Sequence, residues 1–319
     1  MEVARGSAAL PAPPHRAVLT IGNFDGLHCG HRAILETVRE RSAALGGTAV
    51  VYTFDPHPRK ILQPDEAPGM LVTLDQKLEL LEAAGMDLVV LERFDAEFAR
   101  TPPERFVKVC IHERIRPIEV YVGYDFHFGR DREGSMRLLT EMAPHLGFSV
   151  TVIPEVTVGE RDVNSTRIRV LLAEGEVGEA AVLLGRPYAV RGRVVKGEQR
   201  GRTLGFPTLN LAAESEVLPA HGVYAGRVRF LEEGAPAAGE RFDAVINVGR
   251  RPTFAAEDPA LAEAHLLDFD GDAYGRRVEI VFEHRLREER RFPGPDALRE
   301  QIARDVEEGR ARLRAALEA

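Results

Sequence analysis

Two histidines stand among closely spaced glycines near the start of the chain, in the segment Thr20-Ile-Gly-Asn-Phe-Asp-Gly-Leu-His-Cys-Gly-His31. His28 and His31 are three residues apart, so both can face one anion from the first turn of a helix. The glycines permit close approach of the backbone, and a helix N-terminus offers free N–H groups to a phosphate. The alternative is a glycine turn with two solvated histidines. The residues predicted to form this phosphate site are Gly22, Asn23, Phe24, His28, Gly30 and His31.

A second glycine-rich segment, Lys196-Gly-Glu-Gln-Arg-Gly-Arg-Thr-Leu-Gly205, spaces its glycines by four residues among basic side chains. This pattern is typical of a loop that cradles a phosphate. Directly after it, Thr208 and Asn210 offer neutral oxygens that Mg²⁺ accepts while it bridges nucleotide phosphates. A serine/threonine turn followed by a capping asparagine is the alternative for that short segment alone. The phosphate-binding candidates here are Gly197, Arg202 and Gly205.

Three further segments carry polar residues where an expected strand ends or an expected helix begins. His57 follows a strand in Thr53-Phe-Asp-Pro-His-Pro58, and Asp125 lies in Val122-Gly-Tyr-Asp-Phe-His-Phe-Gly129. In Val163-Asn-Ser-Thr-Arg-Ile-Arg169 a helix begins, and an arginine there can bind a triphosphate. Taken singly, each has an ordinary alternative as a turn, a solvated carboxylate or a helix cap. The candidates in the third segment are Ser165, Thr166 and Arg169.

Composition limits the class of protein. The 319 residues are 44% apolar, which is enough for two domains with cores of their own. A net charge of −8 and a pI near 5.8 argue against nonspecific binding to nucleic acid or an anionic membrane. Two cysteines form no disulfide or zinc pattern, and no stretch is apolar enough to span a membrane. We expect a cytoplasmic protein with small-molecule substrates, no nucleic-acid or membrane partner, and possible self-association.

The first half of the chain alternates short apolar runs with helical patterns, which predicts a Rossmann-like α/β domain with a parallel sheet. Such sheets bind ligands where their strands end. Residues 1–15, rich in Ala and Pro, are expected to be a flexible tail. The expected strands lie at 17–24, 49–54, 88–91, 119–122 and 149–153, and the expected helices near 34–45, 74–84, 95–112 and 135–145.

After about residue 184 the apolar runs become longer and are joined by Gly and Pro turns, which predicts an antiparallel β-barrel. The expected strands lie at 188–196, 223–230, 242–248 and 278–286, and an amphipathic helix at 296–317. Gly185-Arg186-Pro187 is the expected boundary, because the proline cannot continue the preceding helix. The predicted domains are therefore 16–184 and 187–319.

The sequence His-x-Gly-His at 28–31 resembles the signature of nucleotidyltransferases that move a nucleoside monophosphate from ATP to a phosphate acceptor. The resemblance implies that His28 and His31 stabilise charge on the attacked α-phosphate and the leaving pyrophosphate. The segments around His57 and Asp125 are similar, in the same order, to those of FAD synthetases. This resemblance to FAD synthetases implies that His57 and Asp125 contact the flavin or its phosphate. The segment 163–169 also matches, with an asparagine at 164 in place of the usual serine.

Phe206-Pro-Thr-Leu-Asn210 resembles the Pro-Thr-Ala-Asn motif of riboflavin kinases, with Leu209 in place of alanine. Because neighbouring side chains alternate in extended backbone, Leu209 should point away from the nucleotide if Thr208 and Asn210 face it. Three later segments also resemble that family, at 221–225, 247–253 and 286–292. In the last of these, Arg287 and Glu289 are weaker candidates for flavin or phosphate contact, since a charge run is usually a solvated face.

With matches in both halves, the chain is identified as a member of the bacterial bifunctional riboflavin kinase/FMN adenylyltransferase family. The resemblance implies transfer of the ATP γ-phosphate to riboflavin, then of AMP from a second ATP to FMN, with Mg²⁺ in both steps. One alternative is that one module has decayed into a flavin-binding or storage domain. A synthetase-like enzyme acting on tRNA is another, which the acidic charge and the kinase-like second half disfavour.

Glu263 is the candidate base of the kinase reaction. In Ala262-Glu-Ala-His-Leu-Leu-Asp-Phe269, strand alternation places Glu263, His265, Leu267 and Phe269 on one face, which begins polar and ends apolar. That is expected where a strand enters a barrel from its open end. The resemblance of this segment to the Val-Glu-x-His of riboflavin kinases implies that Glu263 accepts the 5′-hydroxyl proton. His265 and Asp268 are the rival bases.

Overall fold

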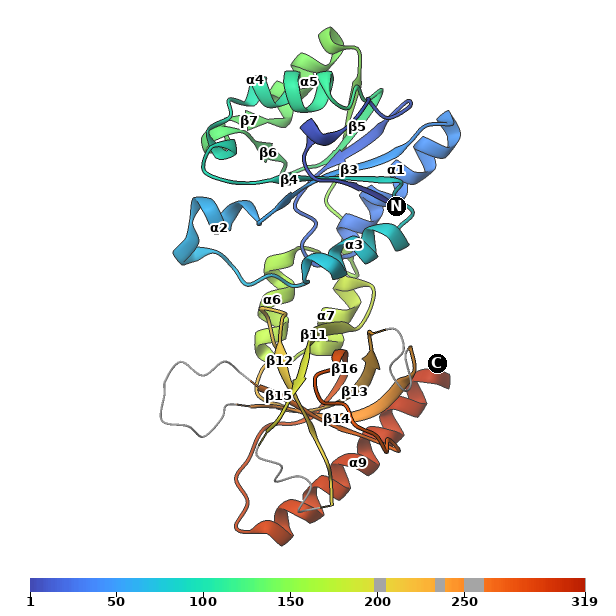
Figure 1. The fold of residues 1–319 in the computed structure, drawn as a ribbon, viewed down its shortest axis with the longest axis vertical. Coiled ribbons are helices and arrows are strands. Elements are labelled where there is room, and N and C mark those ends of the chain that lie inside the picture. The colour runs from blue at the N-terminus through green and yellow to red at the C-terminus, as the bar shows by residue number, and fades with distance from the viewer. Residues whose placement is uncertain (198–204, 233–238, 250–260, 319) are drawn as a thin grey trace. The chain divides into compact units, whose positions relative to one another are not determined.

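The computed structural model describes residues 1–197, 205–232, 239–249 and 261–318 (Figure 1). The chain forms two compact units. The first comprises Met1–Gly69 and Leu74–Val163, and the second comprises Met70–Thr73 and the chain from Asn164 onward. Each unit has a sheet of its own. The boundary of the catalytic domains at 184–187 remains a prediction. The packing boundary is different, because the residues from Asn164 onward pack in the second unit.

The first unit is built on a six-stranded sheet with the order β1-β4-β3-β2-β5-β8. All of its neighbouring strands pair in parallel, which confirms the predicted parallel α/β architecture. The inner strands are short and largely apolar and buried, as is typical of a sheet covered on both faces, whereas the edge strand β8 is largely exposed. The strands are β1 (Glu2–Ala4), β2 (Val18–Ile21), β3 (Ala49–Asp55), β4 (Leu88–Arg93), β5 (Glu119–Gly123) and β8 (Ser149–Ile153).

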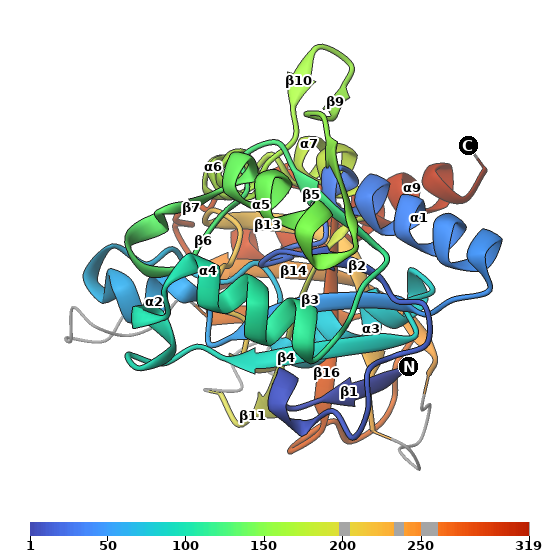
Figure 2. The same ribbon diagram turned by 90° about the horizontal axis from the view of Figure 1, so that it is seen from above.

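Successive side chains along the strands point to opposite faces of the sheet and pack in two separate cores, one on each face. Val18 and Val51 pack in one core with Leu35 and Leu81, from α1 (Cys29–Leu45) and α3 (Leu74–Ala83). Leu19 packs in the other, with the helices between residues 103 and 146 (Figure 2). Those are α4 (Pro103–Arg105), the π-helix η4 (Phe106–Glu113), α5 (Met136–Met142) and the 3-10 helix η6 (Ala143–Leu146).

Short elements complete the first unit. They are α2 (Pro58–Leu62), the 3-10 helices η1 (Ser7–Ala9), η2 (Pro64–Glu66), η3 (Phe98–Arg100) and η5 (Arg130–Arg132), and the hairpins of β6 (His127–Phe128) with β7 (Gly134–Ser135) and of β9 (Thr157–Val158) with β10 (Arg161–Asp162). The single helix expected near 95–112 is broken between η3 and α4. Pro102 and Pro103 explain the break, because a proline ring cannot continue a helix from its preceding turn.

The expected flexible tail over residues 1–15 is wrong in its first part. Glu2–Ala4 forms β1, an edge strand paired with β4. The next residues are held by Glu92, whose carboxylate accepts hydrogen bonds from the backbone N–H and the hydroxyl of Ser7, at 3.0 and 2.7 Å. Tyr52 donates to the same carboxylate. A buried polar cluster, rather than apolar burial alone, therefore fixes this segment.

The second unit contains a closed barrel with the strand order β11-β12-β15-β14-β13-β16. Every described strand pair in it is antiparallel, which confirms the predicted barrel. Helices α6 (Ser165–Glu174) and α7 (Val177–Leu184) precede the barrel, and α9 (Pro295–Glu318) follows it. The strands are β11 (Tyr188–Val195), β12 (Leu209–Ala213), β13 (Gly222–Phe230), β14 (Arg241–Gly249), β15 (Leu261–Leu266) and β16 (Arg277–Arg287).

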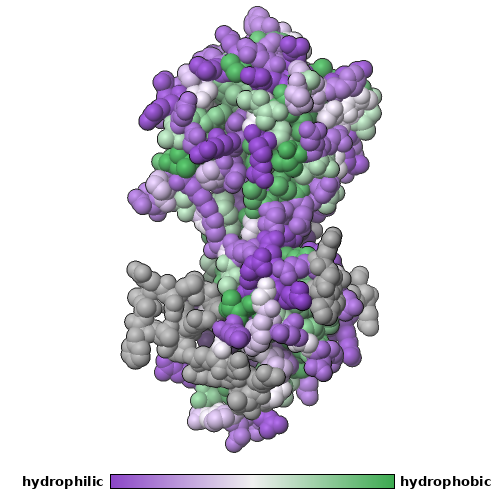
Figure 3. Space-filling view, viewed as in Figure 1, coloured by the Kyte–Doolittle hydropathy of each residue, from purple (hydrophilic) through white to green (hydrophobic). Residues whose placement is uncertain are grey.

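Small, branched and aromatic side chains fill the barrel, among them Tyr224 and Phe282, and helices cover parts of its outer wall. Ala262 and Ala264 of β15 are completely buried and pair with Val248 and Ile246 of β14. Outside, α9 packs closely, since a side chain at Gly309 would lie 3.4 Å from Val245. On the face drawn in Figure 3, hydrophilic and hydrophobic side chains are interspersed. Among the residues described, no helix combines the length and apolar character needed to cross a membrane.

Candidate functional sites in the two units

The first site lies where the sheet of the first unit changes its winding direction. From β2 the chain passes through α1 to β3 and then β4 on one side, and it later returns to β5 on the other side of β2. A parallel sheet binds ligands in the crevice beyond its strand ends at such a point. The segments that follow β2, β3 and β5 hold the predicted residues His28, His57 and Asp125.

A strained turn connects β2 to α1. Phe24, Gly26 and Leu27 have positive φ values of 49°, 81° and 42°. Phe24 and Leu27 are nevertheless buried, at 1% and 2% exposure, so packing in the core holds two non-glycine residues in a conformation they rarely adopt. Backbone strain of this kind is concentrated at functional sites. The turn delivers His28 to the N-cap of α1.

His28 and His31 stack on each other with ring centroids 3.7 Å apart and planes inclined by 15°. Nδ1 of His28 accepts a hydrogen bond from the backbone N–H of His31 at 3.3 Å, so the ring proton of His28 lies on Nε2. The edge contact of His31 with Phe24, at 5.2 Å, fixes the second ring. The structure thus brings together the predicted residues at 22–24, 28, 30 and 31 in one turn.

Burial, and then the nearby His28 and Lys77, lower the pKa of His31 well below its ordinary value. A neutral imidazole therefore stands at the helix N-terminus. Its Nδ1 is buried and, within the described part of the chain, has no hydrogen-bond partner. Because a buried polar atom without a partner is unfavourable, a ligand that bonds to this nitrogen gains more than it would at a solvated one.

Lys77 of α3 is a site residue that the sequence reasoning missed. Its side chain is buried, with 7% exposure, and Nζ donates to the backbone carbonyl of Asn23 at 2.9 Å. Burial lowers the pKa of Lys77, while Asp25 and Asp55 act in the opposite direction. A signal was present, since Leu74 and Leu81 place Lys77 on the apolar side of its helix, where a charged residue needs a partner.

The remaining residues predicted for the first site lie on three other elements. His57 caps α2, with Nδ1 accepting from the N–H of Arg59 at 3.2 Å. Asp125 is exposed in the turn after β5. Asn164, not Ser165, caps α6, and accepts from the N–H of Arg167 at 2.8 Å. The candidates on α6, which are Ser165, Thr166 and Arg169, belong to the second compact unit, so their part in the first site remains a prediction.

The second site lies on the outer wall of the barrel. Residues directly opposite in neighbouring antiparallel strands have Cβ atoms about 5 Å apart on one side of the sheet. Glu263 faces Asn210 of β12 on one side and Asn247 of β14 on the other. The row of opposing residues continues in both directions, and its members are Val195, Asn210, Glu263, Asn247, Val223 and Arg287. Asn247 is the second residue that the sequence reasoning missed.

The expected position of Glu263 on a face leading into the barrel is wrong. Strand β15 ends at Leu266, so the alternation that was extended to Phe269 stops earlier. The residues that point inward are Ala262, Ala264 and Leu266, all buried. Glu263 and His265 therefore lie on the outer face of the barrel and not in its apolar interior. We call the row of opposing residues through Asn210, Glu263 and Asn247 the polar row.

The glycine loop and the Thr208 segment meet at Asn210. A side chain at Gly197 would stand only 2.3 Å from Nδ2 of Asn210, so glycine is required for this contact. Asn210 is 5% exposed, whereas Leu209 pairs with Ala264 inside the barrel, as the alternation predicts. Gly205 has a positive φ of 86°. Arg202, the remaining candidate of this loop, lies outside the described residues.

Both rival bases have partners of their own. Nδ1 of His265 donates to the carbonyl of Pro207 at 2.8 Å, and its ring contacts that of Phe206 edge to face. His265 therefore anchors the segment that carries Thr208. Asp268 forms a two-pronged ion pair with Arg310 of α9, at 2.6 and 2.7 Å.

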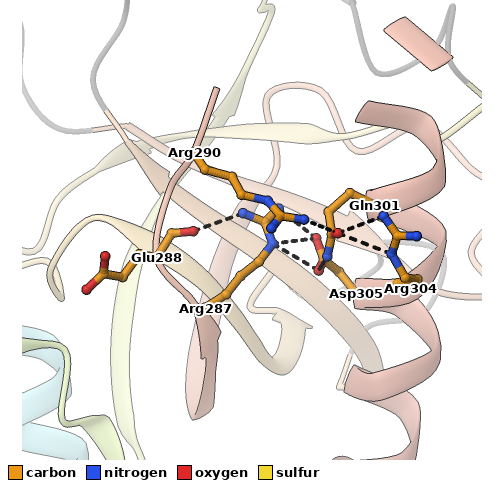
Figure 4. Close-up of polar contacts among 6 residues, drawn as sticks. All are labelled: Arg287, Glu288, Arg290, Gln301, Arg304 and Asp305. Atoms are coloured by element: carbon orange, nitrogen blue, oxygen red, sulfur yellow. Dashed lines mark hydrogen bonds and ion pairs between the residues drawn. The ribbon is translucent and has the colours of Figure 1, made fainter. Parts of the chain in front are cut away.

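Arg287, at one end of the polar row, is held by α9 (Figure 4). Its guanidinium donates to both carboxylate oxygens of Asp305, at 2.7 to 3.1 Å. Gln301 donates to the same carboxylate and accepts from Arg290 and Arg304. Glu289 lies near Asn247, another member of the row. A Cβ atom added at Gly249 would be 3.0 Å from Oε1 of Glu289 and 3.5 Å from Nδ2 of Asn247.

Comparison with known proteins gives a match for each unit. A family model described as FAD synthetase matches residues 10–167, and one described as riboflavin kinase matches residues 184–313. The bifunctional riboflavin kinase/FMN adenylyltransferase of Escherichia coli K12 is 40% identical over 306 residues, which is 96% of each chain. The protein of the same name from Bacillus subtilis is 34% identical, over 92% of this chain and 91% of that one.

A solved structure also matches nearly the whole chain. It is a crystal structure described as a macrolide-efflux protein from Streptococcus pneumoniae. It has a TM-score of 0.84 and 28% sequence identity, and the match covers 97% of this chain and 98% of that one.

Proposed function

The chain belongs to the bifunctional riboflavin kinase/FMN adenylyltransferase family, and we propose from this which of its residues serve each reaction. The enzyme phosphorylates riboflavin to FMN with ATP and converts FMN to FAD with a second ATP, releasing pyrophosphate. The observation that carries both activities is that a family model for each matches a different half of this one chain. We propose that it works in the cytoplasm on these small substrates.

In adenylyl transfer, the phosphate of FMN attacks the α-phosphate of ATP, and the bond to pyrophosphate breaks. The turn at 22–28 and the stacked pair His28 and His31 support an anion at this point, because backbone and imidazole N–H groups can hydrogen-bond the developing charge. His57 and Asp125, which follow β3 and β5, the strands on either side of β2, would contact the flavin substrate. Arg169 serves the triphosphate.

In the kinase reaction, the ribityl 5′-hydroxyl of riboflavin attacks the γ-phosphate of ATP, and ADP leaves. Glu263 accepts the hydroxyl proton, since it is the carboxylate at the centre of the polar row. Its neighbour Asn210 contacts Gly197, the described start of the glycine loop that we propose holds the nucleotide. His265 positions the Thr208 segment, and Arg287 and Glu289 border the flavin end of the row.

The donor set suits magnesium. Thr208 and Asn210 offer neutral oxygens, and in the described parts of the chain no cluster of His, Cys, Asp or Glu could cage a metal. This matches an ion held chiefly by nucleotide phosphates rather than by carboxylates. When bound with ATP, Mg²⁺ would neutralise charge on the transferring phosphate.

A time course with purified protein, riboflavin, ATP and Mg²⁺ tests the two activities. We expect FMN to appear first and FAD to follow. Accumulation of FMN without FAD would mean that the adenylyltransferase module has decayed. His28→Ala or His31→Ala should lower adenylylation by about a hundredfold to a thousandfold and leave the kinase reaction intact, because each removes a group that stabilises charge.

The assignment of Glu263 has its own test. Glu263→Gln should lower kinase turnover by about a hundredfold to ten-thousandfold, because the amide cannot accept the proton. Supplied FMN should still be converted to FAD. Near-normal riboflavin phosphorylation by this variant would refute the assignment of Glu263, and His265 and Asp268 would be tested next.

A further inference from the structure

Lys77 connects α3 to the turn that carries the catalytic histidines. The carbonyl of Asn23 accepts two hydrogen bonds, one from Nζ of Lys77 at 2.9 Å and one from the hydroxyl of Thr53 at 3.3 Å. Thr53 is completely buried in β3. The first residues of the turn are therefore fixed from two neighbouring elements, whereas its own backbone strain at Phe24 and Leu27 favours a different conformation.

The ammonium group also lies among the charges of this site. Asp25, in the turn and 3% exposed, and Asp55, at the end of β3, are the carboxylates that favour its charged form. A buried carboxylate such as Asp25 needs a positive partner, or it would be neutralised. Lys77 therefore offsets part of the negative charge of Asp25 and Asp55 near a site that must accept the triphosphate of ATP.

The ammonium group of Lys77 also affects the pKa of His31. The charged and titratable groups around it are His28 on its own helix, Lys77 on α3, and Asp25 and Asp55 next to Lys77. A positive charge near His31 favours its neutral form, and the carboxylates oppose that effect. Lys77 thus contacts the turn that leads to His28 and lowers the pKa of His31 from a separate helix, α3.

We propose that Lys77 is a positioning residue for adenylyl transfer, which holds the turn at 22–27 and offsets the charge of Asp25 and Asp55 so that His28 and His31 meet the α-phosphate in productive geometry. This rests on the proposed role of the two histidines. Two other roles are possible for a buried lysine. Loss of a purely structural lysine lowers stability and with it both reactions alike, and loss of a direct ATP ligand changes chiefly the KM for ATP.

The kinase reaction of the same molecule provides an internal control. Lys77→Met keeps most of the length and the apolar character of the stem and removes the charge of the side chain. We expect its kcat for conversion of FMN to FAD to fall about a hundredfold, the cost of a small displacement of catalytic groups, with a much smaller change in KM for ATP. Phosphorylation of riboflavin should be unchanged. Lys77→Arg should recover part of the loss, since it restores the charge.

Lys108→Met is the matched variant, because Lys108 is an exposed lysine in η4 of the same unit. It should leave both reactions unchanged. An NMR titration of the His31 ring, assigned by the signal that His31→Gln loses, measures the electrostatic effect of Lys77 on this site, and the split between kcat and KM excludes a purely structural role. Lys77→Met should raise the pKa of His31 toward its ordinary value.

Three results would overturn the proposal. Normal adenylylation by Lys77→Met would show that the turn needs no such contact, and a rise in KM for ATP with unchanged kcat would indicate a direct ligand contact. Equal loss of both reactions would indicate a purely structural role, and should Lys77→Met not fold, Lys77→Arg and the smaller change Lys77→Gln apply the same criteria. Normal adenylylation by His31→Ala would instead refute the proposed site itself, so the two failures are distinguishable.

Discussion

At the residue scale, the kinase site depends on which side chains stand directly opposite each other. Glu263 lies between Asn210 and Asn247, two neutral amides, so its immediate cross-strand neighbours carry no charge. A general base needs this condition, because a second carboxylate beside it would raise its pKa and keep it protonated. The sequence contains Asn247 within a matching segment, but the register that places it beside Glu263 arises only when β14 and β15 pair.

Asn247→Asp tests this arrangement with a change of almost no volume. The added carboxylate should raise the pKa of Glu263, so the acidic limb of the pH profile for kinase kcat/KM should move to higher pH. Asn247→Ala, which adds no charge, should leave the position of that limb unchanged even if turnover falls. A profile of Asn247→Asp that overlays that of the unchanged enzyme would show that residue 247 does not face the base.

His31 couples the stability of the first unit to pH. Its folded-state pKa lies below the ordinary 6.5, with burial as the largest cause. As the pH falls below the pKa of His31 in the unfolded chain, about 6.5, the unfolded chain binds a proton that the folded protein does not. The free energy of unfolding therefore decreases as the pH falls from about 6.5 toward the pKa of His31 in the folded protein. A bound triphosphate favours the charged ring, so ATP binding should take up a proton in this range.

Calorimetry of ATP binding near pH 6, in buffers of different ionisation enthalpy, measures that proton. His31→Gln should show reduced uptake and a flatter dependence of Tm on pH between about 7 and 5. Identical proton uptake by the variant and the unchanged enzyme would assign the linkage to another group, with His28 the first to test.

At the scale of elements, α9 is joined to the barrel by ion pairs of very different burial. Asp305 is buried, with its side chain 3% exposed, and it pairs with Arg287, 19% exposed. Asp268, which pairs with Arg310 on the same helix, is 73% exposed. Removing one member of a buried pair leaves an uncompensated charge, whereas an exposed pair contributes little because water already solvates both groups.

Asp305→Ala should therefore destabilise the docking of α9 by about 3 kcal/mol, the lower end for a broken buried pair. Amide hydrogen exchange along α9 measures this as a lower opening free energy. Arg310→Ala, the matched exposed pair, should change exchange much less. Equal effects of the two variants would mean that the apolar contacts of α9, not the Arg287 network, hold it on the barrel.

Much of the fold follows from local sequence patterns, and the exceptions have identifiable causes. Strands such as β3 and β16 are long apolar or alternating runs, so the parallel sheet and the barrel are predictable. β1 is three residues long and held by Ser7 and Glu92, contacts about 85 positions apart that no local pattern contains. The position of Lys77 on the apolar side of α3 is visible in the local pattern, but its partner Asn23, 54 residues away, is not.

At the scale of the whole molecule, the chain passes between the compact units more than once. Residues Met70–Thr73 belong to the second unit although both flanking segments belong to the first. Leu71 is completely buried, and the N–H of Met70 donates to Glu216 at 2.9 Å. Two reactions on one chain therefore do not imply two fully separable pieces, and truncation should be judged by the packing that each cut removes.

Two fragments compare the predicted catalytic boundary with the packing boundary. All kinase segments from Gly197 to Phe292 lie beyond Pro187, so a fragment beginning there should fold and phosphorylate riboflavin without making FAD. A fragment beginning at Asn164 keeps α6 and α7 and should be the more stable. Because both fragments lack Met70–Thr73, the difference between their stabilities reports the contribution of α6 and α7 alone.

The expected difference follows from what α7 buries beside β11 and β16. Its Leu183 and Leu184 are completely buried, and a buried leucine contributes about 1.5 to 3 kcal/mol. Urea unfolding should therefore give the longer fragment a free energy of unfolding several kcal/mol higher, with similar kinase kcat if the helices only stabilise the barrel. Equal stability of the two would show that α6 and α7 are dispensable to the barrel. A folded but inactive Pro187 fragment would show that residues before 187 complete the kinase site.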